Sequence, residues 1–131
     1  GDSVYIGPNA TLMAAGAPII INSHFMSGPG LTIITGDHRT DIRDKYMDEV
    51  TVAEKLPEND QPVVIEEDVW CGANVTILKG AVVEDAVLLP GVVVEENAVV
   101  KRVIVNNDIK ISKGVVVNKE PEKIALIAED M

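Results

Sequence analysis

The feature that most constrains the fold is a six-residue period between Val63 and Val83. One apolar row falls at Ile65, Cys71, Ile77 and Val83, and a second row falls at Val69, Val75 and Ala81. An amphipathic helix needs apolar residues three and four apart, and a single strand alternates for a few residues and ends, so neither gives this period. Short strands folded into flat faces with a corner after each one do give it. Hexapeptide repeats of this kind indicate a parallel β-helix.

The same period covers most of the chain. It runs through residues 6–12 and 21–33, and it continues with slips from 94 to 117, where the face that ends at Val105 is one residue short. Three such units make one triangular coil, which predicts about 18 residues a coil and roughly five coils. Each coil buries its apolar row only against its neighbours, so the ends of the stack need covering.

Residues 36–61 interrupt the period completely. The stretch is charged and contains Pro57, and a connection of this length in a compact domain is often functional. We expect an excursion loop from one corner of the solenoid, with a short helix around residues 48–55. Residues 119–131 are expected to form a C-terminal cap, as a short helix or a last strand. The length predicts one domain over residues 1–131.

Composition narrows the function classes. Hydrophobic residues make up 47 % of the chain but aromatic residues only 3 %, as expected for a narrow core of small branched side chains. The net charge of −10 argues against a nucleic-acid partner, because phosphate would be repelled. No apolar run reaches the roughly 20 residues that cross a bilayer, and residues 1–9 lack the basic segment of a signal peptide. With one cysteine no intrachain disulfide can form, so we expect a cytoplasmic protein.

Residues 1–83 resemble the hexapeptide-repeat acyltransferases, in particular the maltose, galactoside and serine O-acetyltransferase group. The matching phrases are IGPNATLM, SGPGLTIITGDHRTD, KYMDEV, EKLPENDQPVVIEEDVW and GANVTILKG. The resemblance implies a left-handed β-helix, a homotrimer, acetyl-CoA as donor, a sugar or other small hydroxyl-bearing acceptor, and active sites between adjacent subunits. Left-handedness comes from the resemblance alone, since parallel crossovers are in general right-handed.

The resemblance implies that His38, at the opening of the loop, is the catalytic general base. A histidine in that role takes a proton from the acceptor hydroxyl as the hydroxyl attacks the thioester. The alternative is an ordinary histidine in a charged loop. Trp70 and Ala73 match positions that lie along the bound cofactor in the family. Trp70 could equally be an exposed aromatic that packs on the loop or on a neighbouring subunit.

The remaining reactive residues are interpreted as structural. His24 lies beside Phe25 as an exposed or partly packed side chain, and Cys71 occupies an inward position and packs as a small hydrophobe. Two histidines and one cysteine are too few for the usual zinc site, so no metal is expected.

Departures from the family support a second hypothesis. The sugar-holding Asn and Asp of the family are replaced by Gly7 and by Ala14 and Ala15, and the closing motif with Pro-Ala-Lys is absent. Residues 83–131 instead resemble the C-terminal β-helix of ADP-glucose and related sugar nucleotidyltransferases, in the phrases DAVLLPGVVVEENAVVKRVIVNND, ISKGVVV and PEKIALIAEDM. That coil serves assembly and regulation. The second hypothesis is a non-catalytic scaffold or trimerisation module, an engineered or recombined chimera joined near Val83. A third, a detached assembly domain of a nucleotidyltransferase, does not account for the long loop.

Overall fold

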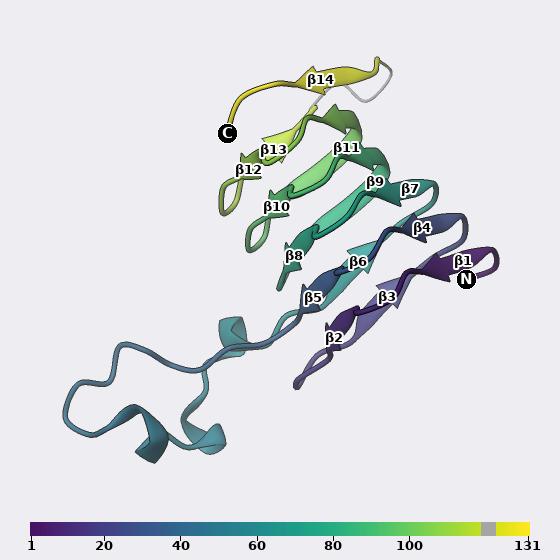
Figure 1. Ribbon diagram of the computed structural model, residues 1–131. Helices are drawn as coiled ribbons and strands as arrows, with labels where there is room; N and C mark the ends of the chain where they lie inside the picture. Colours follow the sequence, from purple (N-terminus) through teal and green to yellow (C-terminus); the bar gives the residue numbers. More distant parts are fainter. Residues whose placement is uncertain (119–122) are drawn as a thin grey trace.

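The computed structural model describes residues 1–118 and 123–131, which form a solenoid of short parallel strands (Figure 1). The strands are β1 (Val4–Ile6), β2 (Thr11–Met13), β3 (Ile19–Ile21), β4 (Phe25–Ser27), β5 (Thr32–Ile34), β6 (Val63–Ile65), β7 (Val69–Cys71), β8 (Thr76–Leu78), β9 (Val82–Leu88), β10 (Val93–Val94), β11 (Val99–Val105), β12 (Lys110–Ile111), β13 (Val116–Val117) and β14 (Ala125–Ile127). The predicted all-β parallel β-helix is confirmed, and its coils are consistent with the left-handed form.

The strands stack into three flat faces. Face 1 contains β1, β4, β7, the second half of β9, the second half of β11, and β14. Face 2 contains β2, β5, β8, β10 and β12. Face 3 contains β3, β6, the first half of β9, the first half of β11, and β13. Five complete coils and the added β14 make about six turns, where the repeat predicted about five.

The predicted apolar rows form the core. All seven residues of the two rows between Val63 and Val83 are at most 1 % exposed. Phe25, the only phenylalanine, is fully buried in the same cluster. Ser27 takes an inward place among these apolar residues, and its hydroxyl oxygen accepts a hydrogen bond from the backbone N–H of Gly7 at 3.2 Å. The polar exception in the row is therefore paired, as a buried hydroxyl must be.

The coils shorten along the stack. Val64 pairs with Val82, whereas Val82 pairs with Val99, so the second of these coils is one residue shorter than the first. The missing residue lies at the corner from face 3 to face 1, where β9 and β11 bend without interruption. The bend is made at Asp85 and Arg102, which have positive φ angles of 45° and 46°. A one-residue corner replaces the longer turn used in the earlier coils.

The corner from face 1 to face 2 uses positive φ angles at every level. The residues concerned are Asn9, Gly30, Asn74, Gly91 and Asp108. Gly91 has a φ of 80°, and a Cβ there would collide with the carboxylate of Asp108 in the next coil. At another corner, Gly114 has a similar φ of 74°, but no heavy atom lies within 4 Å of the place a Cβ would take. The two glycines therefore separate the cost of backbone conformation from the cost of a clash.

Alanine at these glycines is expected to give unequal losses of stability. Gly114→Ala should lower the free energy of unfolding by about 1–2 kcal/mol, the cost of a left-handed conformation for a residue with a Cβ. Gly91→Ala should cost roughly 1–3 kcal/mol more, because the new methyl overpacks the corner. Urea unfolding of the two variants beside the parent chain measures the difference. Equal losses would show that Asp108 moves aside without cost.

The C-terminal tail ends as a strand. β14 pairs with β11 on face 1, and Met131 exchanges backbone hydrogen bonds with Lys110 and Ser112 next to face 2. Of the two expected forms of the cap, the described residues 123–131 adopt the strand, whereas residues 119–122 lie outside the described part. Two chain segments thus satisfy edge groups of the last coil that would otherwise be open for pairing.

Candidate functional site

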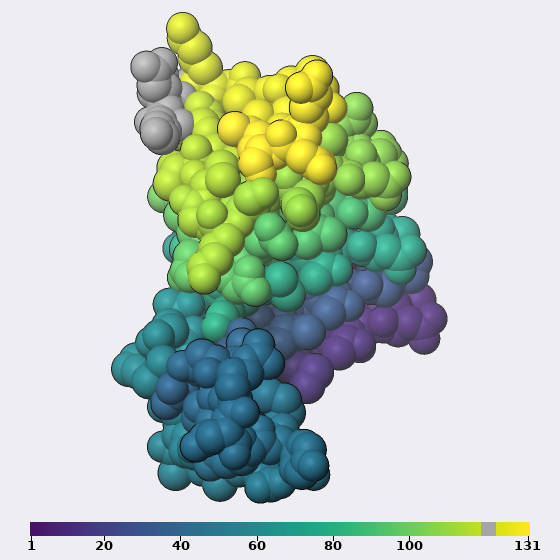
Figure 2. Space-filling view, turned by 90° about the vertical axis from the view of Figure 1, so that its left-hand side faces the viewer, coloured from purple at the N-terminus to yellow at the C-terminus, as the bar shows by residue number. Residues whose placement is uncertain are grey.

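The excursion loop leaves the solenoid at the corner between faces 2 and 3, between β5 and β6 (Figure 1). Figure 2 shows it as a lobe standing out from the stack near the N-terminal coils. Its root is a short two-stranded ladder, because Gly36 bridges Asp60 in antiparallel fashion and the N–H of Gln61 donates to the carbonyl of Thr35 at 2.9 Å. The short helix expected around residues 48–55 is instead two 3₁₀ turns, η1 (Met47–Glu49) and η2 (Val52–Glu54), followed by η3 (Pro57–Asn59).

A network of charged and polar groups locks this root, and we call it the loop clamp: Asp37, Lys79, Asn59 and the carbonyl of Glu58. The Lys79 ammonium lies 2.8 Å from Oδ2 of Asp37 and donates to the Glu58 carbonyl at 2.7 Å. The Asn59 amide donates to Oδ1 of Asp37 at 2.8 Å. The side chain of Lys79 is only 12 % exposed. The clamp thus joins both ends of the loop to the residue that follows β8.

The clamp also sets the charge of Asp37. Partial burial raises the pKa of this carboxyl, but the hydrogen bonds from Lys79 and Asn59 outweigh burial, so its pKa lies below the ordinary value of 3.8. Farther out, the Lys45 ammonium hydrogen-bonds Glu54 at 2.6 Å and, with the backbone N–H of Thr51, lowers the pKa of Glu54 to about 2. Both carboxylates are therefore charged at neutral pH, and the loop is held by ion pairs and 3₁₀ turns.

His38 follows the clamp directly and is exposed. Within the described residues, no hydrogen bond reaches its imidazole, while the carboxylate of the preceding Asp37 is occupied on both oxygens. The structure therefore fixes the backbone up to Asp37 and leaves the imidazole accessible. Because the Asp37 carboxylate is hydrogen-bonded to Asn59 and Lys79, it does not orient the imidazole ring of His38.

Trp70 and Ala73 lie close together in sequence, on and just after β7. Trp70 points outward from the middle of face 1 with 41 % of its surface exposed, and Ala73 is partly exposed at the corner from face 1 to face 2. Face 1 lies opposite the corner from which the loop departs. A single chain therefore does not bring Trp70 and His38 together.

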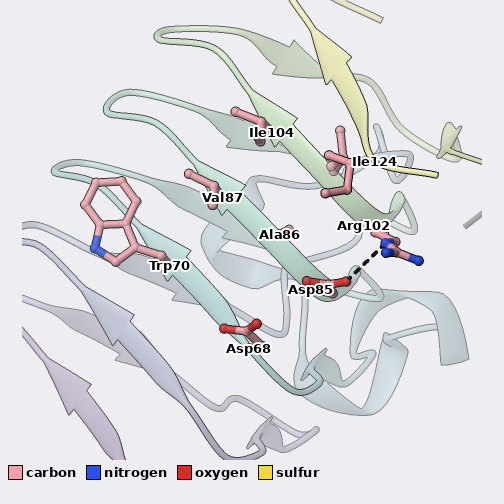
Figure 3. A pocket seen from close by; sticks show the side chains of 9 residues that line it. Asp68, Trp70, Asp85, Ala86, Val87, Arg102, Ile104 and Ile124 are labelled. Carbon is pink, nitrogen blue, oxygen red and sulfur yellow. Dashed lines mark ion pairs between the residues drawn. The ribbon is translucent and has the colours of Figure 1, made fainter. Parts of the chain in front are cut away.

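Trp70 belongs to an exposed apolar row that the sequence analysis missed. The row runs along face 1 through residues in register, namely Tyr5, Met26, Trp70, Val87, Ile104 and Leu126. Figure 3 shows Trp70, Val87 and Ile104 on neighbouring strands with Ile124 beside them, around a hollow. At its edge Arg102 Nε lies 3.7 Å from Asp85. The sequence pattern could have shown this row, because its members are the outward-pointing middle residues of successive face 1 strands.

Comparison with known proteins finds a family match for residues 48–131 of the chain. A family model described as the GMPPB C-terminal domain matches residues 48–131, which is more than half of the chain. The chain belongs to this family. The match agrees with the predicted likeness of residues 83–131 to the C-terminal β-helix of sugar nucleotidyltransferases, and it extends that likeness back into the loop as far as residue 48. It does not stop at Val83, where the two resemblances were expected to meet.

One solved structure is also similar. It is a maltose O-acetyltransferase from Clostridium difficile 630, 18 % identical, with a TM-score of 0.48. The alignment covers 95 % of this chain and 55 % of that protein, so the chain spans about half of its length. A search of curated protein sequences gives no significant match. His38 lies outside the region matched by the GMPPB C-terminal domain family, whereas Lys79 and Asn59 of the loop clamp lie within it.

In this member of the GMPPB C-terminal domain family, the other reactive side chains are Cys71 and His24, and their positions indicate structural roles. Cys71 is fully buried, and burial raises the pKa of its thiol to about 12, so it stays a neutral thiol at physiological pH. His24 is exposed at a corner, with a φ of 61°. Over residues 1–118 and 123–131, no group of three or more His, Cys, Asp or Glu side chains could hold a metal ion. No helix in the same residues is long and apolar enough to cross a membrane.

Removing the Lys79 ammonium is expected to loosen the loop root. In Lys79→Met the aliphatic stem remains but Asp37 loses its charged partner, so the free energy of unfolding should fall by about 1–3 kcal/mol. Amide exchange should quicken at Asp37 and Gln61, whose N–H groups close the ladder. The matched control is Lys101→Met, which breaks an exposed pair with Glu84 at 3.6 Å and should cost less than about 1 kcal/mol. Equal effects would mean that the clamp contributes no more than a surface ion pair.

The same ladder should respond to acid. Because the pKa of Asp37 is lower in the folded chain, its contribution to stability is complete above its ordinary pKa and is lost as the pH falls through the lowered value. Protection of the ladder amides should therefore decrease below a pH of about 3.8. In Asp37→Asn this step should be absent, and a persistent step would assign it to another carboxylate.

Proposed function

We propose that the chain is an acetyl-CoA-dependent O-acetyltransferase that works as a cytoplasmic homotrimer, with His38 as general base. The observation that carries this proposal is the loop root. The clamp holds the backbone up to Asp37, and the next residue presents an accessible imidazole. A general base needs this combination of a fixed place and access to the acceptor.

The reaction needs no covalent enzyme intermediate. The imidazole of His38 takes the proton of the acceptor hydroxyl, and the oxygen forms a bond to the acetyl carbonyl carbon of acetyl-CoA. The tetrahedral intermediate then collapses, the carbon–sulfur bond breaks, and the departing thiolate receives the proton from the imidazolium. The products are the acetyl ester of the acceptor and free CoA.

The proposed trimer supplies the rest of the site. Trp70 and Ala73 would line the pantetheine arm of acetyl-CoA, but they lie on face 1, away from His38 of the same chain. A second subunit would have to present its face 1 to the loop of the first. The loop carries large apolar side chains toward solvent, among them Tyr46 and Val52, which suits contact with another subunit.

A second candidate function is a non-catalytic assembly module. The observation that favours it is the extent of the family match, which covers residues 48–131 and leaves out His38. The chain also has Gly7, Ala14 and Ala15 where the sugar O-acetyltransferases have the residues that hold the acceptor, and this replacement points the same way. In this case the apolar row of face 1 would serve association alone.

Two measurements separate the candidates. Calorimetric titration with acetyl-CoA, combined with an assay of CoA release over a panel of hydroxyl acceptors, is expected to show binding and turnover. No binding at millimolar acetyl-CoA would overturn the enzyme and leave the assembly module. Light scattering is expected to give a trimer. A monomer at micromolar concentration would remove any site shared between subunits.

A further inference from the structure

A shallow pocket lies beside the loop root, on the side of face 2. Its lining residues are Ile34, Gly36, Asp37, Leu78, Lys79 and Glu96. Ile34 and Leu78 are paired in register on β5 and β8, and Met13 on β2 extends the same row. Met13 is 50 % exposed. The pocket therefore has an aliphatic floor that continues toward the N-terminal coil, and it begins one residue before His38.

The polar groups at this pocket are largely engaged with one another. Both carboxylate oxygens of Asp37 accept hydrogen bonds, one from Asn59 and one from Lys79. The Lys79 ammonium also donates to the carbonyl of Glu58. A ligand with many hydroxyl groups would lose hydrogen bonds to water on entering and would find few free partners in return. An aliphatic surface loses nothing comparable and gains by leaving water.

The remaining charge at the rim further restricts the ligand. Glu96 lines the pocket as a carboxylate, whereas the Lys79 ammonium is already paired with Asp37. A negative charge on a molecule in this pocket would be repelled by Glu96 at short range. The pocket thus suits a molecule without negative charge.

We propose that the acceptor is a neutral molecule whose hydroxyl is attached to an aliphatic body, and that Ile34 and Leu78 hold that body. This rests on the proposed acetyl transfer only for what happens to the hydroxyl. Binding of the aliphatic body can be tested without acetyl-CoA. The resemblance of residues 1–83 to the O-acetyltransferases implies a sugar as acceptor, but an unsubstituted sugar is the acceptor that this pocket fits least.

A series of six-carbon molecules tests whether the pocket prefers an aliphatic body to one that carries many hydroxyl groups or a negative charge. The probes are 1-hexanol, sorbitol, which carries a hydroxyl on every carbon, and 6-hydroxyhexanoate, which adds a negative charge. Methyl NMR of Ile34 and Leu78 is recorded with each probe in the absence of acetyl-CoA. The expected result is a saturable shift of these methyls with 1-hexanol, at least tenfold weaker binding of 6-hydroxyhexanoate, and no shift with sorbitol. Equal shifts with sorbitol, or shifts confined to the methyls of Val87 and Ile104 on face 1, would overturn the proposal.

A variant pair tests the floor directly. Leu78→Asn should weaken 1-hexanol binding at least tenfold, whereas Val116→Asn, a change of an exposed outward residue on face 3, should leave it unchanged. Circular dichroism checks folding, and Ile34→Thr replaces Leu78→Asn if the latter does not fold. Equal weakening by the Leu78 and Val116 changes would overturn the proposal. Methyl shifts without turnover would support binding of an aliphatic ligand in this pocket and count against the enzyme, so the two proposals fail separately.

Discussion

His38→Ala is expected to lower the rate of acetyl transfer by roughly 100- to 10,000-fold, the usual contribution of a general base. The loss should appear in kcat, because the imidazole acts on the proton that moves during the reaction. The side chain is exposed and receives no hydrogen bond from the described residues, so the free energy of unfolding should change by no more than about 0.5 kcal/mol. Initial rates of CoA release, with urea unfolding of the same preparation, measure both quantities.

The matched control is His24→Asn, which removes the other histidine. Asparagine tolerates the positive φ of 61° at this corner better than most residues, so the fold should keep its stability. Turnover of this variant should equal that of the parent chain. If His38→Ala kept full turnover, the base would lie elsewhere and the loop root would be a structural feature only.

Phe25→Ala is expected to cost about 3–5 kcal/mol of stability, the largest loss from a single core truncation in this chain. Phe25 is fully buried on β4, where it pairs with Val4 on one side and Val69 on the other. Removing the ring leaves a cavity between flat strands that cannot close over it. Urea unfolding with linear extrapolation measures the loss.

The neighbouring residue provides the control. Met26 lies on the same strand but points outward and is 53 % exposed, so Met26→Ala should cost less than about 1 kcal/mol. Because each coil contacts only its neighbours, the Phe25 change should raise amide exchange in β1, β4 and β7 more than in β11. A loss below about 1 kcal/mol for Phe25→Ala would mean that the N-terminal coils contribute little to the cooperative unit.

The sequence predicted the solenoid well because one observable, the six-residue period, reports the inward row of every face. The shortened coil was harder to foresee. It depends on Asp85 and Arg102 accepting a left-handed conformation inside continuous strands. Aspartate adopts this conformation more often than most residues, but arginine does not, and a strand is not where either is expected to do so. The slip before Val105 was visible, but its cause was not.

The candidate site was predictable only in part. The opening of the loop at His38 follows from the resemblance, and the break in the period locates the loop. The clamp joins Asp37 to Lys79, which lies beyond the whole loop and the next three strands, and no local pattern connects two charges so far apart in sequence. The place of Trp70 relative to His38 depends on the corner from which the loop leaves the solenoid. The hexapeptide period alone does not assign strands to faces, so it does not predict this corner.

The continuous bend at Asp85 and Arg102 limits how such a chain can grow or shrink. Val82, Val99 and Val116 stack in register, and the interval from the first to the second equals the interval from the second to the third. A duplication or deletion of that interval adds or removes one whole coil and keeps every inward side chain inward. A segment longer by a single residue, the length of the coil before β9, also needs the longer corner of that coil to take up the extra residue. If the corner stayed one residue wide, the extra residue would enter a strand and turn the later apolar rows toward water. Length changes in this half of the molecule are therefore expected in whole coils, and the length of a coil is set by the width of one corner.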